Sequence, residues 1–240
     1  MGRARLGSAR RSRGLTLTGH LTALPAAVLL DMDGTLVDSD AAVERAWTSW
    51  AAEHGVEPDA VLAIAHGSPP DPTVRAMLPD LDTRAVAAAA ARQMALQYDD
   101  LSDVVAAAGA DALLGVLSRL GLPWAVVTSA DVRLARVRLD AAGIPAPPLL
   151  VTVEDVRVGK PDPEGYRIAA ARLGVDPARC LVVEDAGPGV AAGRAAGMTV
   201  AGLRGIESDV AVADLGELAD LLLSAAGAPR AAGSPRPSRR

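Results

Sequence analysis

The sequence predicts an α/β protein: a parallel β-sheet with helices on both faces and an inserted all-helical domain. From about residue 109, short apolar runs alternate with helical patterns, which is typical of repeated β-then-α units. An earlier apolar run at 26–30 supplies a first strand, and the block from 40 to 104 contains no strand-like run. The expected core is therefore formed by 25–39 and 105–226, with 40–104 inserted.

The first strand is a continuous apolar run at 26–30, as expected of a strand buried on both faces of a parallel sheet. The other expected core elements are helices at 110–120, 132–142, 163–173, 189–196 and 214–225, and strands at 124–127, 149–151, 180–183 and 198–201. This is a Rossmann-like arrangement, in which ligands bind beyond the carboxyl ends of the strands.

The insert reads as a series of helices. Ser39 is a suitable N-cap for the first helix, and Gly55 ends it. The helices are expected at 40–54, 58–66, 73–78 and 82–98. Trp47 and Trp50 are most simply explained as the core of this insert.

The composition excludes several classes of function. Half of the residues are hydrophobic, but only 2% are aromatic, and no apolar stretch is long enough to span a membrane. The single cysteine, Cys180, precedes an apolar run and indicates a buried residue in a reducing, cytoplasmic compartment. The three histidines are scattered, which predicts no histidine-based zinc or iron site.

Charge is concentrated at the two ends of the chain. Residues 1–20 and 228–240 carry arginines and no acid, so the part between them is more acidic than the net charge of −5. We therefore expect no nucleic-acid partner.

We expect a disordered basic extension at 1–24 and a disordered tail at 227–240. A signal peptide is disfavoured because cleavage after its apolar part would remove the first strand. Apart from a disordered extension, the other explanation of this N-terminal segment is a start site placed too early.

Two acids follow the first strand. Asp31 and Asp33 stand two residues apart, and Gly34 permits the sharp turn that ends the strand. An ordinary Asp-Gly turn would explain Asp33 and Gly34, but not the second acid. Two carboxylates delivered by a buried strand can share one metal ion and one phosphoryl group.

Polar residues also follow two later strands. Thr128 and Ser129 come after the strand at 124–127, and Glu184 and Asp185 follow the strand at 180–183. Parallel strands bring these ends to one edge. The alternatives are that Thr128 caps the next helix, and that the two acids are favoured by a helix dipole.

Lys160 is the only lysine among the 24 Lys and Arg residues. Lysine is a compact point charge, whereas arginine is a wide planar fork, so the exception indicates a crowded site. Pro161 and Pro163 stiffen the surrounding loop. The alternative is chance codon usage.

Taken together, these four segments, between about residues 25 and 225, resemble the haloacid dehalogenase-like hydrolase superfamily, the aspartate-nucleophile phosphatases. The helical insert looks like the small cap domain of one branch. The resemblance implies that Asp31 is the nucleophile and that Asp33 is the acid and base. It implies that Thr128 and Ser129 bind the phosphoryl oxygens and that Lys160 links them to Asp31.

The resemblance also implies a Mg²⁺ site. Its ligands would be the carboxylates of Asp31 and Asp185 and the backbone carbonyl of Asp33, with Glu184 as a second nearby carboxylate. Oxygen ligands are what this ion prefers.

Among members of this superfamily, hydrolysis of a phosphate ester is favoured. Asp33 argues against a dehalogenase, and the absence of lysine from the insert argues against a phosphonate hydrolase. The finer resemblance is to sugar and glycerol phosphatases. It implies that His66 and Arg75 face the substrate. The alternatives are that His66 is a core or loop histidine and that Arg75 is a solvated helix residue.

A β-phosphoglucomutase-like mutase, a phosphoglycolate phosphatase and a catalytically silent relative stay open as alternative functions. The expected partner is a small phosphorylated metabolite, without a membrane, and the chain is expected to be a monomer or a homodimer.

Overall fold

A six-stranded parallel sheet forms the centre of the molecule. The computed structural model describes residues 21–65 and 69–227. The strands lie in the order β5-β4-β1-β6-β7-β8, and every neighbouring pair is parallel. Their bounds are β1 Ala27–Leu30, β4 Trp124–Val127, β5 Leu150–Val151, β6 Cys180–Glu184, β7 Thr199–Gly202 and β8 Val210–Ala211.

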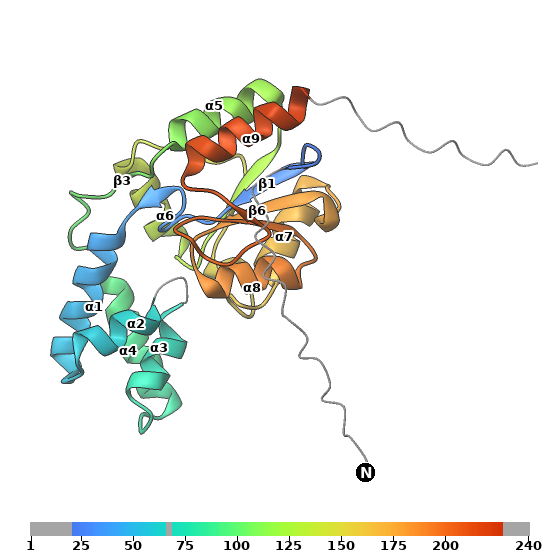
Figure 1. Cartoon of the computed structure of the whole chain (residues 1–240). Helices are drawn as coiled ribbons and strands as arrows, with labels where there is room; N and C mark the ends of the chain where they lie inside the picture. The colour runs from blue at the N-terminus through green and yellow to red at the C-terminus, as the bar shows by residue number, and fades with distance from the viewer. Residues whose placement is uncertain (1–20, 66–68, 228–240) are drawn as a thin grey trace, which may run out of the picture.

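Helices cover both faces of this sheet, and the predicted α/β class is confirmed. The core helices are α5 Ala110–Leu120, α6 Val132–Ala141, α7 Glu164–Leu173, α8 Gly187–Ala195 and α9 Leu215–Gly227. One apolar cluster joins the sheet to α5, α6 and α9, and a second joins its other face to α7 and α8. Figure 1 shows α5 and α9 side by side over one face, with α7 and α8 on the other.

The strand β1 contributes to both clusters. Val28 and Leu30 point into the first, and Ala27 and Leu29 into the second, so all four side chains are buried. Its two neighbours are β4 and β6, with Leu30 opposite both Val126 and Val183. The ends of three adjacent strands therefore lie side by side, and this positions the site.

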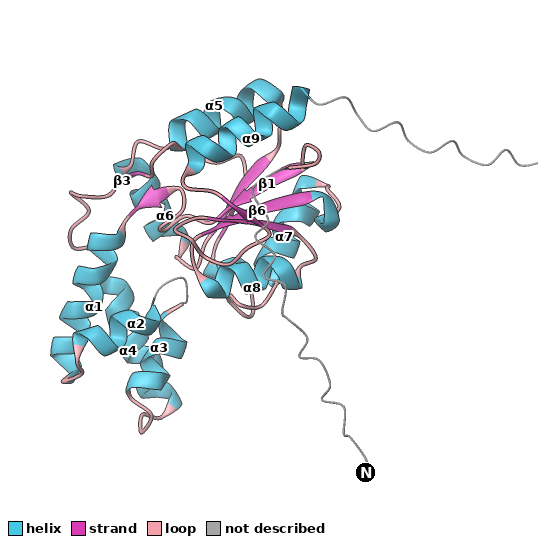
Figure 2. Ribbon diagram, in the orientation of Figure 1, coloured by secondary structure: helices cyan, strands magenta, loops and turns pink. Residues whose placement is uncertain are grey.

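The inserted domain, hereafter the cap, is helical in its described part and lies apart from the sheet (Figure 2). Its helices are α1 Asp40–His54, α2 Pro58–Ala65, α3 Pro70–Met77 and α4 Thr83–Leu96. Trp47 and Trp50 pack edge to face within the apolar cluster of the cap, as predicted. The Nε1 of Trp50 donates to the carbonyl of Ala89 on α4. The cap therefore has a core of its own.

Three short strands were not expected from the sequence. The pair β2 Val37–Asp38 and β3 Val105–Ala106 is antiparallel and joins the segments through which the chain leaves the core and returns to it. The third, β8, is an edge strand of two residues. Such short strands have too few residues to show an alternating pattern, and backbone pairing alone defines them.

Several boundaries also differ from the sequence prediction, two of them by three or more residues. Helix α3 begins at Pro70 instead of residue 73, because proline is well accommodated in the first turn of a helix. The predicted extension at 1–24 overlaps four described residues, of which Leu21 and Leu24 pack against the core, so these four belong to it. The rest of that extension and residues 228–240 lie outside the described residues. In the described part of the chain, no helix is both long and apolar enough to cross a bilayer.

Candidate active site

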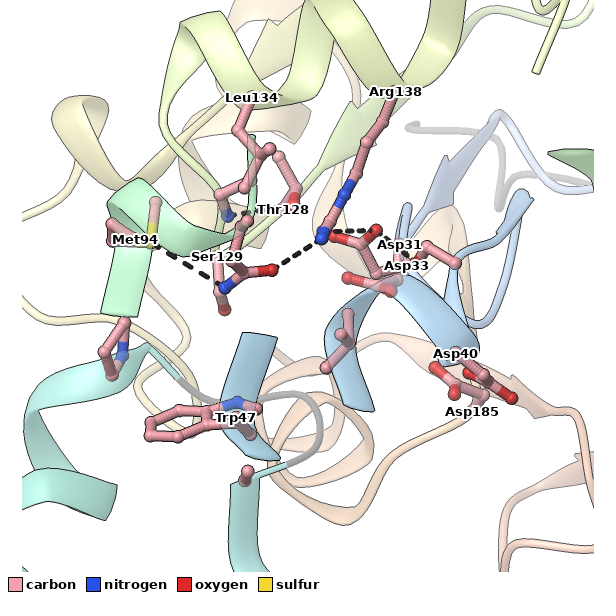
Figure 3. A pocket seen from close by; sticks show the side chains of 16 residues that line it. Asp31, Asp33, Asp40, Trp47, Met94, Thr128, Ser129, Leu134, Arg138 and Asp185 are labelled. Carbon is pink, nitrogen blue, oxygen red and sulfur yellow. Dashed lines mark hydrogen bonds and ion pairs between the residues drawn. The ribbon is translucent and has the colours of Figure 1, made fainter. Parts of the chain in front are cut away.

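The carboxyl ends of β1, β4 and β6 bring together the polar residues that the sequence singled out. Asp31 follows β1, Thr128 follows β4, and Glu184 is the last residue of β6. Asp31, Thr128 and Glu184 are buried. Figure 3 shows Asp31, Asp33, Thr128 and Asp185 around one cavity, which the cap closes on its far side with Trp47.

The turn after β1 is shaped around Asp185. Gly34 has a φ of +80°, and a Cβ on it would lie 2.1 Å from Oδ2 of Asp185. A larger residue would thus be strained and would displace this carboxylate. Thr35 donates its hydroxyl to Oδ1 of Asp185 at 3.1 Å. The turn therefore fixes Asp185 beside Asp31.

Lys160 is a buried cation held by three acceptors. Its Nζ donates to Asp31, to Oε1 of Glu184 at 2.7 Å and to the carbonyl of Val127 at 3.1 Å. These match the three N–H donors of an ammonium group. The geometry supports the expectation that a compact cation is needed here, because a planar guanidinium does not point its donors to three converging acceptors.

Glu184 is held from two further sides. The hydroxyl of Tyr166 donates to its Oε1 at 2.5 Å. Gly189 leaves room for the carboxylate, because a Cβ there would lie 1.8 Å from that oxygen. One oxygen of Glu184 is thus occupied by Lys160 and Tyr166. Its first role is to hold the lysine against Asp31.

Asp33 lies on the open side of the same turn, with 26% of its side chain exposed. The hydroxyl of Ser39 donates to its Oδ1 at 2.6 Å. The Nη1 of Arg138, on helix α6, forms an ion pair with the same oxygen at 2.7 Å. These two contacts hold the carboxylate of Asp33, which lines the same cavity as Asp31.

The crowding of acids raises their pKa values. Burial raises the pKa of Asp31 well above its usual range, with Lys160 opposing the shift and Glu184 and Asp185 adding to it. Burial and the neighbouring Glu184 raise the pKa of Asp185 to about 6. Burial alone would lower the pKa of Lys160, but Asp31 and Glu184 raise it, so the lysine stays charged. The acids are therefore hard to ionise together, although Lys160 and Arg204, which lies 3.7 Å from Asp185, oppose the rise in pKa.

A divalent cation fits this donor set. Ligand oxygens of Asp31, Glu184 and Asp185 all lie within 4.8 Å of one another. Carboxylate oxygens suit a hard cation such as Mg²⁺, which would also relieve the repulsion among the acids. Because Oε1 of Glu184 is already occupied, this residue could offer only its other oxygen.

Thr128 is not the capping residue of the next helix. The N-cap of α6 is Asp131, which accepts from the backbone N–H of Leu134 at 2.7 Å. The Oγ1 of Thr128 accepts from the N–H of Ala130 at 3.0 Å, so its own hydroxyl hydrogen can still point elsewhere. Thr128 and Ser129 both line the cavity.

Of the two cap residues predicted to face the substrate, the structure describes only Arg75. Arg75 is exposed on α3 and is not among the residues that line the cavity. His66 lies outside the described residues. The cap instead contributes Val43, Trp47 and Gln97 to the cavity wall.

Sequence reasoning missed two polar residues, Arg138 and Gln97. Arg138 is only 1% exposed, although it is one of several arginines on α6. A signal was present: Leu134 and Leu139 mark the apolar face of α6, and Arg138, four residues after Leu134, lies on it. Gln97, just after α4, carries no such signal.

The fold and the site define a class of protein: an α/β core that presents carboxylates at the carboxyl edge of a parallel sheet, beside a helical cap. A sequence profile of the haloacid dehalogenase-like hydrolases matches residues 25–197. The chain belongs to this family and is a phosphatase, a phosphoric monoester hydrolase.

Several proteins are similar to this chain. Hexitol phosphatase A of Escherichia coli (strain K12) is 45% identical over 172 residues, covering 72% of this chain and 80% of that protein. Glycerol-1-phosphate phosphohydrolase 2 of Saccharomyces cerevisiae is 31% identical, covering 79% and 78%. The crystal structure of β-phosphoglucomutase from Clostridium difficile has a TM-score of 0.73 at 18% identity, covering 81% and 93%. That last likeness shows the fold alone.

Proposed function

We propose that this enzyme is a Mg²⁺-dependent phosphatase that hydrolyses a small sugar or polyol phosphate through an aspartyl-phosphate on Asp31. The observation that carries the proposal is the placement of two acids on one turn. Asp31 is buried and held by Lys160, whereas Asp33 is partly exposed and lines the same cavity. One carboxylate is thus placed to attack and the other to exchange protons.

In the first step, an oxygen of Asp31 attacks the phosphorus atom, and the bond to the ester oxygen breaks. Protonated Asp33 gives its proton to that oxygen, so the alcohol leaves neutral. In the second step, Asp33 takes a proton from water, whose oxygen attacks the phosphorus and releases inorganic phosphate. Asp31 is thereby returned to its starting state. Dividing the hydrolysis into two displacements lowers each barrier.

The remaining residues compensate charge on the phosphoryl group. Lys160 is positioned to contact a phosphoryl oxygen from its place beside Asp31, and Thr128 and Ser129 line the wall where the other oxygens would bind. A bound Mg²⁺, held by Asp31, Asp185 and the carbonyl of Asp33, would supply positive charge next to the phosphoryl group.

The choice of substrate class rests on the relatives. Hexitol phosphatase A and the glycerol-1-phosphate phosphohydrolase each have names that specify a polyol phosphate. The cavity is consistent with such a substrate, because polar and apolar side chains from the cap and the core face each other across it. A cytoplasmic metabolite of this kind also suits a chain with a single cysteine.

The test is phosphate release from a panel of hexitol phosphates, glycerol phosphates, hexose phosphates and phosphoglycolate, with Asp31→Asn beside the parent. We expect kcat to fall by at least about 10⁴-fold in the variant, as for other essential nucleophiles. Asp59→Asn, an exposed acid on α2, is the matched control and should behave as the parent. Equal rates in Asp31→Asn and the parent would remove Asp31 as the nucleophile. Conversion of hexose 1-phosphate to 6-phosphate without free phosphate would identify a mutase instead.

A further inference from the structure

A buried polar chain connects the acid Asp33 of the core with the cap. The Nη1 of Arg138 contacts Asp33, and its Nη2 donates to Oε1 of Gln97 at 2.5 Å. The Nε2 of Gln97 in turn donates to Oε1 of Gln93 at 3.1 Å. We call these four residues the Arg138 network; Figure 3 shows Arg138 reaching from α6 toward Asp33.

The Arg138 network has unused hydrogen-bonding capacity. Among the described residues, two buried side-chain atoms lack a hydrogen-bond partner: Nε of Arg138 and Nε2 of Gln93. Leaving a buried donor unsatisfied is unfavourable, so such groups call for an explanation, such as a ligand. Both atoms belong to one network, but only Arg138 and Gln97 line the cavity, and Gln93 does not. We therefore consider Arg138 and Gln97 as the place where a polar ligand would contact the network.

The position of Arg138 restricts what this ligand is. In the proposed reaction, Asp33 must touch the ester oxygen of the leaving alcohol. Arg138 is 2.7 Å from the carboxylate of Asp33, so it lies within reach of a substituent on the carbon next to the ester. The neighbouring wall is apolar, formed by Val43, Met94 and Leu134. Arg138 and Gln97 therefore supply polar contacts on that side of the alcohol.

The donors and acceptors of the network favour a hydroxyl group over an anion. Arg138 offers only donors, whereas Gln97 offers a carbonyl acceptor as well as an amide donor. A hydroxyl group can accept from the guanidinium and donate to Oε1 of Gln97, whereas a carboxylate or phosphate can only accept.

We propose that Arg138 and Gln97 bind a hydroxyl group on the carbon adjacent to the phosphate ester, and so determine specificity for polyol phosphates. This assignment rests on the proposed function of the site. A phosphate ester without that hydroxyl would leave the network unsatisfied and would bind less well, because a site built around a hydroxyl group discriminates strongly against its absence.

The experiment compares two substrates that differ only in hydroxyl groups: glycerol 1-phosphate and propyl phosphate. We expect the parent to prefer glycerol 1-phosphate in kcat/KM by roughly tenfold to a hundredfold or more. In Arg138→Met and Gln97→Leu this ratio should fall toward one, chiefly through KM for glycerol 1-phosphate. Arg136→Met changes an exposed arginine of the same helix and should keep the parent ratio.

A merely structural role would give a different result. If the network only supports the fold or orients Asp33, both substrates lose rate together and the ratio stays unchanged, which overturns the proposal. Gln97→Leu matters here because Gln97 does not contact Asp33, and melting curves identify any variant that fails to fold.

A binding measurement separates this proposal from the proposed function. Calorimetry of both esters is carried out with Asp31→Asn, alone and combined with Gln97→Leu. A preference for glycerol 1-phosphate that Gln97→Leu abolishes supports the hydroxyl site even if no ester is hydrolysed. Equal affinities for the two esters in Asp31→Asn overturn it, even if the parent proves to be a phosphatase.

Discussion

The two ends of the cavity are built in different ways. At the phosphoryl end, Asp31, Glu184 and Asp185 lie at adjacent strand ends and Lys160 lies in a loop, where its Nζ donors all have acceptors. The alcohol end, formed by Arg138 with the cap residues around Gln97, also contains a buried cation, but leaves donors unpaired. The difference is consistent with reacting groups that the core holds in place, and with a binding site for the alcohol whose donors are paired only when a ligand contacts both core and cap.

Removal of divalent metal is expected to have the largest effect on the phosphoryl end. Chelation should lower kcat by about a thousandfold or more, because the metal is worth several kcal/mol of charge stabilisation. Restoring Mg²⁺ should also raise Tm, because binding at a hundred times its Kd adds about 2.7 kcal/mol to the free energy of unfolding. Both effects are measured by phosphate release and by thermal melting.

Asp185→Asn provides the matched test. This variant should lose most of the Mg²⁺-induced rise in Tm, whereas Asp220→Asn, an exposed acid on α9, should keep it. Full activity after thorough chelation would contradict a metal-dependent site and would leave the acids to be compensated by Lys160 and Arg204.

Replacement of Lys160 should be the next largest effect. Lys160→Met leaves Asp31 and Glu184 buried without their cation, which should cost about 3–5 kcal/mol in denaturant unfolding. It should lower kcat by about 10²–10³-fold, as for loss of one charge-stabilising group.

The Lys160→Arg variant tests whether a positive charge at this position is sufficient for catalysis. The three acceptors converge on one nitrogen, so we expect kcat to fall nearly as far as in Lys160→Met. Near-parent rates would mean that the single lysine of this chain reflects chance rather than the shape of the site.

The same contrast between the two ends explains what could be predicted from the sequence. Asp31, Thr128, Glu184 and Asp185 follow apolar strands, and parallel strands bring such residues to one edge whatever the details of packing. Lys160 was marked by composition and by its rigid loop. These features are local, so the sequence alone was sufficient to place them.

The alcohol end depends on how the cap docks onto the core. Gln97 follows α4 and Arg138 lies on α6, and their contact requires an orientation of two helices that hydrophobic periodicity does not encode. The short pair β2 and β3, which connects cap and core, was missed for a related reason, because two-residue strands have no pattern. Arg75 was expected at the cavity and is exposed on α3 instead.

Loss of the Tyr166 hydroxyl should give the smallest effect, and it tests how completely the phosphoryl end is determined. Burial and Glu184 raise the pKa of Tyr166 well above its usual range, so the hydroxyl stays protonated and donates to Glu184 at neutral pH. Tyr166→Phe removes that donor but leaves Lys160 bound to the same carboxylate. We expect a loss of about 1 kcal/mol in denaturant unfolding and a fall in kcat of roughly two- to tenfold.

The other tyrosine of the chain is the control. Tyr98 also donates its hydroxyl to a carboxylate, Asp131, at 2.6 Å, but away from Lys160. Tyr98→Phe should lower stability by a similar amount and keep kcat within about twofold of the parent. If the two variants lose kcat equally, Tyr166 does not position Lys160 through Glu184, and the phosphoryl end is less tightly determined than its hydrogen bonds indicate. If only Tyr166→Phe loses kcat, an intact hydrogen-bond chain from α7 to Asp31 is part of what distinguishes this end of the cavity from the other.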